Sequence, residues 1–133
     1  MSAAAALRAR YMGDTVATAS PQQLLVMLYD RLALDLERAQ TALARGDHDE
    51  ASRQLLHAQD IVTELHSSLR VDVWEGGPRL SALYAWLSTE LVNANVKRDR
   101  NRVRSCLQVV EPLRDAWRQA AASLAGSPVA SSA

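Results

Sequence analysis

Apolar residues recur at helical spacing in four long segments of this 133-residue chain. Steps of three and four residues place side chains on one face of an α-helix, whereas a half-buried strand would show strict alternation. No segment has sustained alternation with β-branched residues. Proline, glycine and polar turn residues separate the four segments. The pattern therefore predicts an all-α fold.

The first two helices have sequence signals at their starts. Ser20 is a good N-cap, and Gln23 stands at the third position, where it completes a capping box. Gly46 is a helix stop, and it is followed by a second capping pair, Asp47 and Glu50. The stripe of the first helix is Leu25, Leu28, Leu32, Leu36, Ala39 and Leu43. That of the second is Ala51, Leu55, Ala58, Val62, Leu65 and Leu69.

The third and fourth helices follow a loop predicted over residues 71–78, which contains Gly76, Gly77 and Pro78. The stripe of the third helix is Leu80, Leu83, Leu87, Leu91 and Ala94. After a polar turn at 95–99, the stripe of the fourth is Val103, Cys106, Val110, Leu113, Trp117 and Ala120. Pro112 lies inside this last helix, where it removes a backbone donor, so we expect a kink.

Short connections make neighbouring helices antiparallel. The fold class is therefore an all-α, antiparallel, up-and-down four-helix bundle with an additional short N-terminal helix. We expect a mobile N-terminal segment over 1–17 that holds this short helix, a helical bundle over 18–124 and a disordered tail over 125–133.

Composition narrows the class of protein. The net charge is +0, which disfavours nucleic acid and anionic membranes as partners. The single cysteine cannot form an internal disulfide. No apolar run is long enough to span a bilayer, and no secretory signal is evident. We therefore expect a cytoplasmic protein. Phe is absent, so we expect an aliphatic core.

Candidate catalytic residues are few. His57, Asp60 and Glu64 share one face of the second helix, but that face lies roughly opposite the apolar stripe, where water competes for a metal. Cys106 falls on an apolar stripe, where a cysteine behaves as a small hydrophobe. No phosphate-cradling glycine loop or nucleophile elbow is present. We expect no enzyme, no metal and no cofactor.

The first helix carries more apolar residues than one bundle face can use. Ten of the residues from 24 to 36 are apolar, and Met27 and Leu34 share a side with Arg31 and Arg38. Either another helix of the chain covers this side, or it is an apolar strip rimmed by charge that receives a partner. Elsewhere, Trp86 lies off its stripe, where it either packs beside the loop at Trp74 or binds a partner.

Five short motifs occur in a fixed order along the chain. They are TASP with LLVMLYD at 18–30, AQDIVTEL with SSL at 58–69, GG with LY at 76–84, ANVKRD at 94–99 and LRDAW at 113–117. Together they resemble the flagellar secretion chaperone FliS family over residues 11–120. The stretch between Gly77 and Leu83 is about one helical turn shorter than the family pattern, and Pro112 departs from it.

The resemblance implies a function. Family members are antiparallel helical bundles that bind the C-terminal segment of flagellin in the cytoplasm. They block its premature polymerisation and help to deliver it to the flagellar type III export gate. The implied partners are therefore the disordered C-terminal segment of flagellin and a component of the export gate.

The resemblance also points to residues. The N-terminal segment of the family is thought to occupy part of the client site when that site is empty, and here it carries Leu7, Tyr11 and Val16. We expect the client to contact apolar side chains of the first two helices, above all Met27 and Leu34, with Leu56 and Ile61 as weaker candidates.

Two other functions stay open. One is a structural four-helix module that pairs with itself through Met27 and Leu34, as a weak homodimer. The other, less favoured, is a metal-dependent bundle enzyme that uses His57, Asp60 and Glu64.

Overall fold

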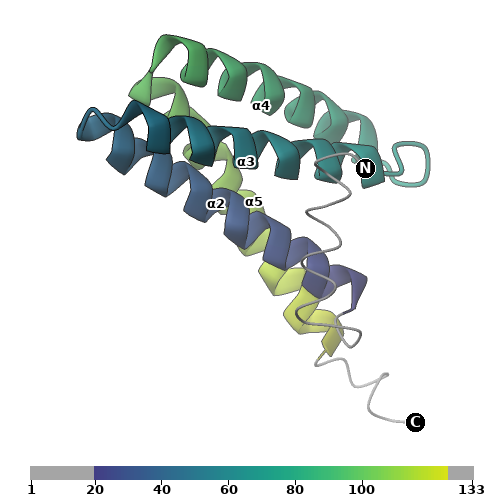
Figure 1. Cartoon of the computed structure of the whole chain (residues 1–133). Coiled ribbons are helices and arrows are strands. Elements are labelled where there is room, and N and C mark those ends of the chain that lie inside the picture. Colours follow the sequence, from purple (N-terminus) through teal and green to yellow (C-terminus); the bar gives the residue numbers. More distant parts are fainter. Residues whose placement is uncertain (1–19, 126–133) are drawn as a thin grey trace, which may run out of the picture.

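Four helices make up the fold in the computed structural model, which describes residues 20–125 (Figure 1). They are α2 (Pro21–Ala44), α3 (His48–Ser68), α4 (Gly77–Lys97) and α5 (Arg100–Ala125). The predicted all-α fold is confirmed, and there is no strand within 20–125. The short helix expected in the N-terminal segment and the tail from 126 onward lie outside the described residues.

The predicted caps of α2 are present. Gln23 N donates to Ser20 Oγ over 3.1 Å, and Ser20 N donates to Gln23 Oε1 over 2.9 Å, which completes the capping box. At the other end Gly46 has φ +75°, and Asp47 N donates to Ala42 O over 2.9 Å. A left-handed residue after the last turn closes a helix in this way, and glycine adopts it without strain.

The next helix starts as predicted, with one difference. Glu50 N donates to Asp47 Oδ1 over 3.2 Å, so Asp47 is the N-cap of α3. The Glu50 carboxylate does not return to the cap. It accepts hydrogen bonds from Arg53 and Gln54 on its own helix instead. The capping box predicted here is therefore only half formed.

Each helix packs against two others. α2 contacts α3 and α5, and α4 also contacts α3 and α5, so the helices close a ring in chain order. Figure 1 shows α3 beside α4, with α2 and α5 running together diagonally beneath them. The two-residue turn between α4 and α5 and the short one between α2 and α3 lie at the same end of the bundle. This is the antiparallel up-and-down arrangement that short connections predict.

The core is mostly aliphatic and alanine side chains, as predicted, with two tyrosines added. Its members have little or no exposed surface, and the largest are Tyr29, Tyr84, Leu32, Leu36, Leu55, Ile61, Leu65, Leu87 and Leu91. The expectation of a wholly aliphatic core was therefore wrong. Both tyrosines remain compatible with burial because their hydroxyl groups bond to each other, as described below.

Gly77 determines how the loop before α4 folds, and Pro112 lies at an exposed position of α5. A Cβ at Gly77 would lie 2.4 Å from the backbone oxygen of Val71, so only glycine permits the loop to fold back on the start of α4. Pro112 is exposed, and α5 is helical on both sides of it from Arg100 to Ala125.

Candidate partner-binding surface

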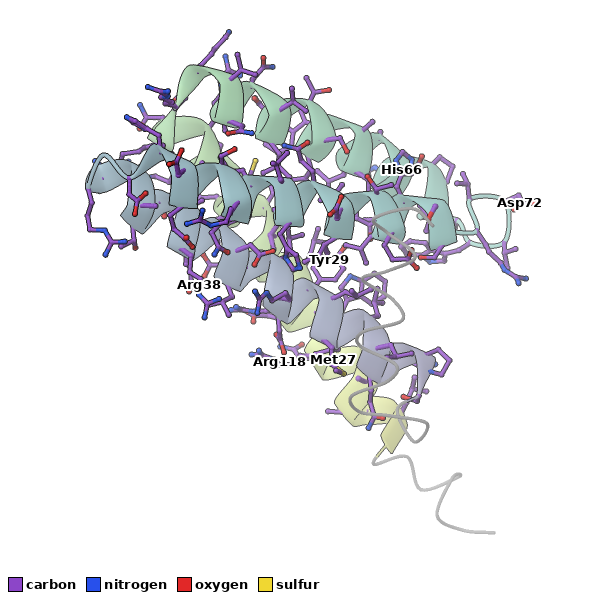
Figure 2. All side chains as sticks on the ribbon, in the orientation of Figure 1. Met27, Tyr29, Arg38, His66, Asp72 and Arg118 are labelled. Atoms are coloured by element: carbon purple, nitrogen blue, oxygen red, sulfur yellow. The ribbon has the colours of Figure 1, made fainter. Side chains whose placement is uncertain are left out.

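The apolar residues of α2 divide between the core and a half-covered outer side. Tyr29, Leu32 and Leu36 are buried, whereas Met27 and Leu34 are half-buried. Figure 2 shows Met27 and Arg38 along the edge of α2 that is turned away from α4. The sequence left two interpretations of this side of α2: cover by another helix, or an apolar strip that receives a partner. Neither holds alone. Packing within the described residues covers most of this helix, but part of Met27 and Leu34 remains in solvent.

A shallow hollow adjoins Leu34 at the end of α2. Its lining combines one apolar side chain with charged and polar groups: Leu34, Glu37, Arg38, Thr41, Arg45, Asp47 and Glu50. Part of the charge is already paired, because Arg53 Nη2 contacts Glu50 Oε2 at 2.5 Å. An apolar centre with a polar rim is the usual anatomy of a protein-binding surface.

A buried carboxylate fixes α2 against α3 beside this hollow. Arg31 Nε donates to Asp35 Oδ1 over 2.9 Å, and His57 Nδ1 makes a short contact with Asp35 Oδ2. Burial raises the pKa of Asp35, while the hydrogen bond and positive charge of His57, and then those of Arg31, act in the opposite direction. Loss of either partner would leave a buried carboxylate poorly satisfied. These contacts therefore specify how α2 and α3 pack.

A chain of aromatic rings links the loop to the core. Trp74 lies against Trp117, and Trp117 lies against Tyr29, each with ring centroids 6.3 Å apart. The hydroxyl groups of Tyr29 and Tyr84 are 2.6 Å apart, and the His66 ring packs 5.8 Å from that of Tyr84. Trp74 thus packs beside Trp117. The suggested contact between Trp86 and the loop at Trp74 stays a prediction.

The structure separates the four predicted partner-binding residues. Ile61 is fully buried in the core cluster, so its proposed place on a binding surface was wrong. Leu56 is exposed, on the side of α3 that is turned away from its buried residues. Leu7, Tyr11 and Val16 lie outside the described residues.

The polar face of α3 is not the solvated face that the sequence predicted. His57 contacts Asp35, and Glu64 is only 5% exposed. Within residues 20–125, no three or more His, Cys, Asp or Glu side chains gather as metal ligands would. Across that same range, no helix combines the length and hydropathy needed to cross a bilayer.

Sequence reasoning missed the two polar links inside the bundle. Tyr29 and Tyr84 occur in the LLVMLYD and LY motifs, but nothing local shows that they meet. Asp35 was also missed, although it sits among apolar residues on the buried side of a helix, which is a signal for a paired charge.

Comparison with known proteins decides the family. A family model described as flagellar protein FliS matches residues 3–124. The flagellar secretion chaperone FliS of Bacillus subtilis strain 168 is 32% identical over 110 residues, which span 83% of this chain and 82% of that protein. The Salmonella typhimurium protein of the same name is also 32% identical over 110 residues, which span 80% of each chain.

The chain belongs to the FliS family.

A solved structure supports the fold as well. A bacterial flagellar chaperone superposes with a TM-score of 0.71 at 22% identity, over 90% of this chain and 98% of that one. FliS proteins are chaperones in flagellar secretion and not enzymes. This agrees with the burial of Cys106, whose thiol pKa is raised to about 12 by that burial.

Proposed function

We propose that this FliS protein is a cytoplasmic chaperone that binds the disordered C-terminal segment of flagellin, prevents its premature polymerisation and supports its export through the flagellar type III system. Membership of the FliS family carries the proposal. The half-buried pair Met27 and Leu34 supports a place for the client on the outer side of α2. We propose that handover to an export gate component then releases the client.

The physical basis is coupled folding and binding. A flagellin terminus that is disordered alone loses chain entropy when it orders. Burial of apolar area at about 25 cal/mol per Å² offsets that loss if the receiving surface is already formed. α2 is held by its cap, by Asp35 and by the aromatic contacts of Tyr29, so Met27 and Leu34 are presented on a rigid helix. We include Leu56 as a second, separate contact.

The test is calorimetric titration of the full chain with the C-terminal segment of flagellin from the same organism. We expect one-to-one binding with a negative heat-capacity change, because apolar surface is buried. A Met27→Asp, Leu34→Asp double variant should bind at least tenfold more weakly. A Gln108→Asp, Gln119→Asp variant adds the same charge at exposed positions of α5 and should bind normally.

The outcomes separate the function from the site. Equal binding by both double variants would keep the function and remove Met27 and Leu34 from the site. Absence of binding by folded wild-type protein would contradict the proposed function. A sub-stoichiometric effect on flagellin polymerisation would also contradict it, because a holding chaperone acts in a fixed ratio.

A further inference from the structure

Positive charge gathers at the turn between α4 and α5, at the end of the bundle where α2 and α3 are also joined (Figure 1). This turn and the start of α5 form an open hollow, which is lined by Lys97, Arg98, Asp99, Arg100, Asn101 and Arg104. All four cationic side chains are exposed, and none of them makes an ion pair within residues 20–125. Unpaired cations around one hollow attract a negatively charged partner.

The nearby carboxylates do not neutralise this charge. Arg102 Nε is 3.2 Å from Asp99 Oδ2, and Arg102 Nη1 is 2.5 Å from Glu90 Oε2, so both carboxylates are already engaged. Asp49, at the start of α3, is exposed and lines an adjoining hollow together with Arg98, but the two are not within ion-pair distance. Asp49 therefore limits the positive surface on the side of α3 and leaves the rest of it unpaired.

Arg98 occupies a backbone position that glycine fills elsewhere in this fold. It ends α4 with φ +52°, and the next N–H, that of Asp99, donates to a carbonyl of the last turn over 3.0 Å. Gly46 ends α2 with φ +75° and the same kind of bond, 2.9 Å long. A Cβ is strained in this conformation. Lys97 already places a cation in the last turn of α4, so folding does not explain an arginine at 98.

Two further arginines are placed unfavourably for α5. Arg100 is the first residue of the helix, where the partial positive charge of the helix start disfavours a cation. Arg104 follows four residues later, so two like charges share one side of the helix. Neither guanidinium bonds to another residue of the described range. Folding gains nothing from these two cations, which are free to contact a ligand.

The geometry of the hollow selects among anions. A phosphate group at a helix start is usually held by free backbone N–H groups. Here the N–H groups of Asn101 and Arg102 already donate to Asp99 Oδ1, over 3.0 and 3.3 Å. Asp99 also lines the hollow, so it repels a compact anion at the centre, whereas separated carboxylates can reach the cations around it. Nucleic acid needs a longer basic footprint, and Asp49 borders this one.

Apolar side chains adjoin the cations. The neighbouring hollow is lined in part by Leu43, Ala51 and Val96, and Arg98 belongs to both hollows. Val96 is 74% exposed, so it is open to contact. An apolar residue of the partner therefore fits beside its carboxylates.

We propose that the turn between α4 and α5 binds an acidic segment of another protein, through Lys97, Arg98, Arg100 and Arg104. The segment carries several separated carboxylates and an apolar residue that contacts Val96. No residue that lines this hollow also lines the one beside Leu34. The acidic partner is therefore bound while the proposed flagellin client occupies the α2 side.

Fluorescence anisotropy of the full chain with a labelled synthetic peptide of glutamate pairs separated by leucines tests this surface. We expect binding that Arg100→Gln, Arg104→Gln weakens at least tenfold. The matched control Arg70→Gln, Arg79→Gln removes two exposed arginines near the start of α4 and should bind normally. Circular dichroism shows that each variant is folded. Absence of binding by wild-type protein, or equal weakening by the control, overturns the proposal.

Arg98→Gly separates binding from folding. The substitution removes a cation and relieves the left-handed strain, so the urea midpoint should stay the same or rise while peptide binding weakens several-fold. Arg98→Lys keeps the charge and should bind almost as well as wild type. Unchanged binding by Arg98→Gly would remove Arg98 from the surface, and a lower urea midpoint would give Arg98 a structural role instead.

Other probes identify the other occupants. The same peptide with glutamine in place of glutamate should not bind. Tighter binding of inorganic phosphate or of a ten-nucleotide RNA than of the acidic peptide would contradict the proposal. So would loss of flagellin binding in Arg100→Gln, Arg104→Gln, because the surface would then belong to the client. Wild-type protein that binds the peptide but not the flagellin segment would contradict the proposed function and support this surface.

Discussion

Two polar groups inside the bundle depend on each other for hydrogen bonding. Tyr29 and Tyr84 bring two hydroxyl groups into an otherwise apolar core, where each is the other's partner at 2.6 Å. Burial raises the pKa of Tyr84, with further contributions from the charge and hydrogen bond of Tyr29. Both rings therefore stay neutral, and each depends on the other to satisfy its hydroxyl.

Tyr84→Phe tests this dependence. The substitution removes one hydroxyl and leaves that of Tyr29 without its partner, so we expect a loss of about 1–3 kcal/mol in the free energy of unfolding. The double variant Tyr29→Phe, Tyr84→Phe should cost less than the sum of the two single changes, because no unpaired group remains. Urea unfolding of the four proteins measures the coupling. Additive costs would show that the hydroxyl contact contributes nothing.

Cys106 allows a second test at a single residue. Its thiol is buried, and that burial, followed by the negative charge of Glu90, raises its pKa to about 12. Reaction with a thiol reagent at pH 8 should be at least roughly a thousandfold slower than that of a free thiol. Full reaction should occur in denaturant. Rapid reaction of the folded protein would mean that α5 opens readily.

Pairs of helices are held in register by contacts that differ from pair to pair. Asp35 joins α2 to α3 through His57, Arg102 joins α5 to α4 with Nη1 2.5 Å from Glu90 Oε2, and Arg118 joins α5 to α2 with Nη2 2.6 Å from Asp30 Oδ1. The last pair is about half exposed, so it stabilises little. Asp35 is buried, and its contacts have the larger effect on how two helices pack.

Asp35 should therefore impose a pH dependence on stability. Its folded-state pKa lies above the unfolded value near 3.8, so the native state retains a proton that the unfolded chain has lost. The contribution of Asp35 is then fully present below that unfolded value and is lost as pH rises through the folded pKa. The difference in unfolding free energy between wild type and Asp35→Asn should fall from pH 4 upward and then level off.

The control for this series is Glu37→Gln, an exposed carboxylate on the same helix, which should show no such trend. Urea unfolding at several pH values gives both differences. A difference for Asp35→Asn that rises with pH would mean that His57 and Arg31 outweigh the effect of burial.

Residues 20–125 share one core, and no helix in that range has a core of its own. A single cluster of buried residues draws on all four described helices, and the ring of helix contacts closes through α2 and α5. Such a domain unfolds as a unit, because loss of one helix exposes a face of two others.

Truncation of the core tests this cooperativity. Leu36→Ala in α2 and Leu91→Ala in α4 each remove a fully buried side chain, and each should cost about 2–5 kcal/mol. Tryptophan fluorescence and far-ultraviolet circular dichroism should still report one coincident transition in both variants. Separate transitions in Leu91→Ala would show that α4 is an independent unit.

The sequence by itself determined what depends on near neighbours in the chain. The cap at Ser20, the stop at Gly46 and the four stripes are set by local backbone bonds and by the helical period, so they predicted the helices and their antiparallel order. The order of the FliS motifs predicted the family for the same reason, because motifs are read along the chain.

The tertiary structure alone decided which side chains meet. The hydroxyl pair joins residues 55 positions apart, and the contact of His57 with Asp35 joins residues 22 apart. A helical stripe gives the face of a residue but not the helix opposite it, so it placed Ile61 on a binding surface when that residue is buried. The exposure of Val92 and Val96 on α4 could likewise not be predicted, since exposure depends on what the other helices leave uncovered.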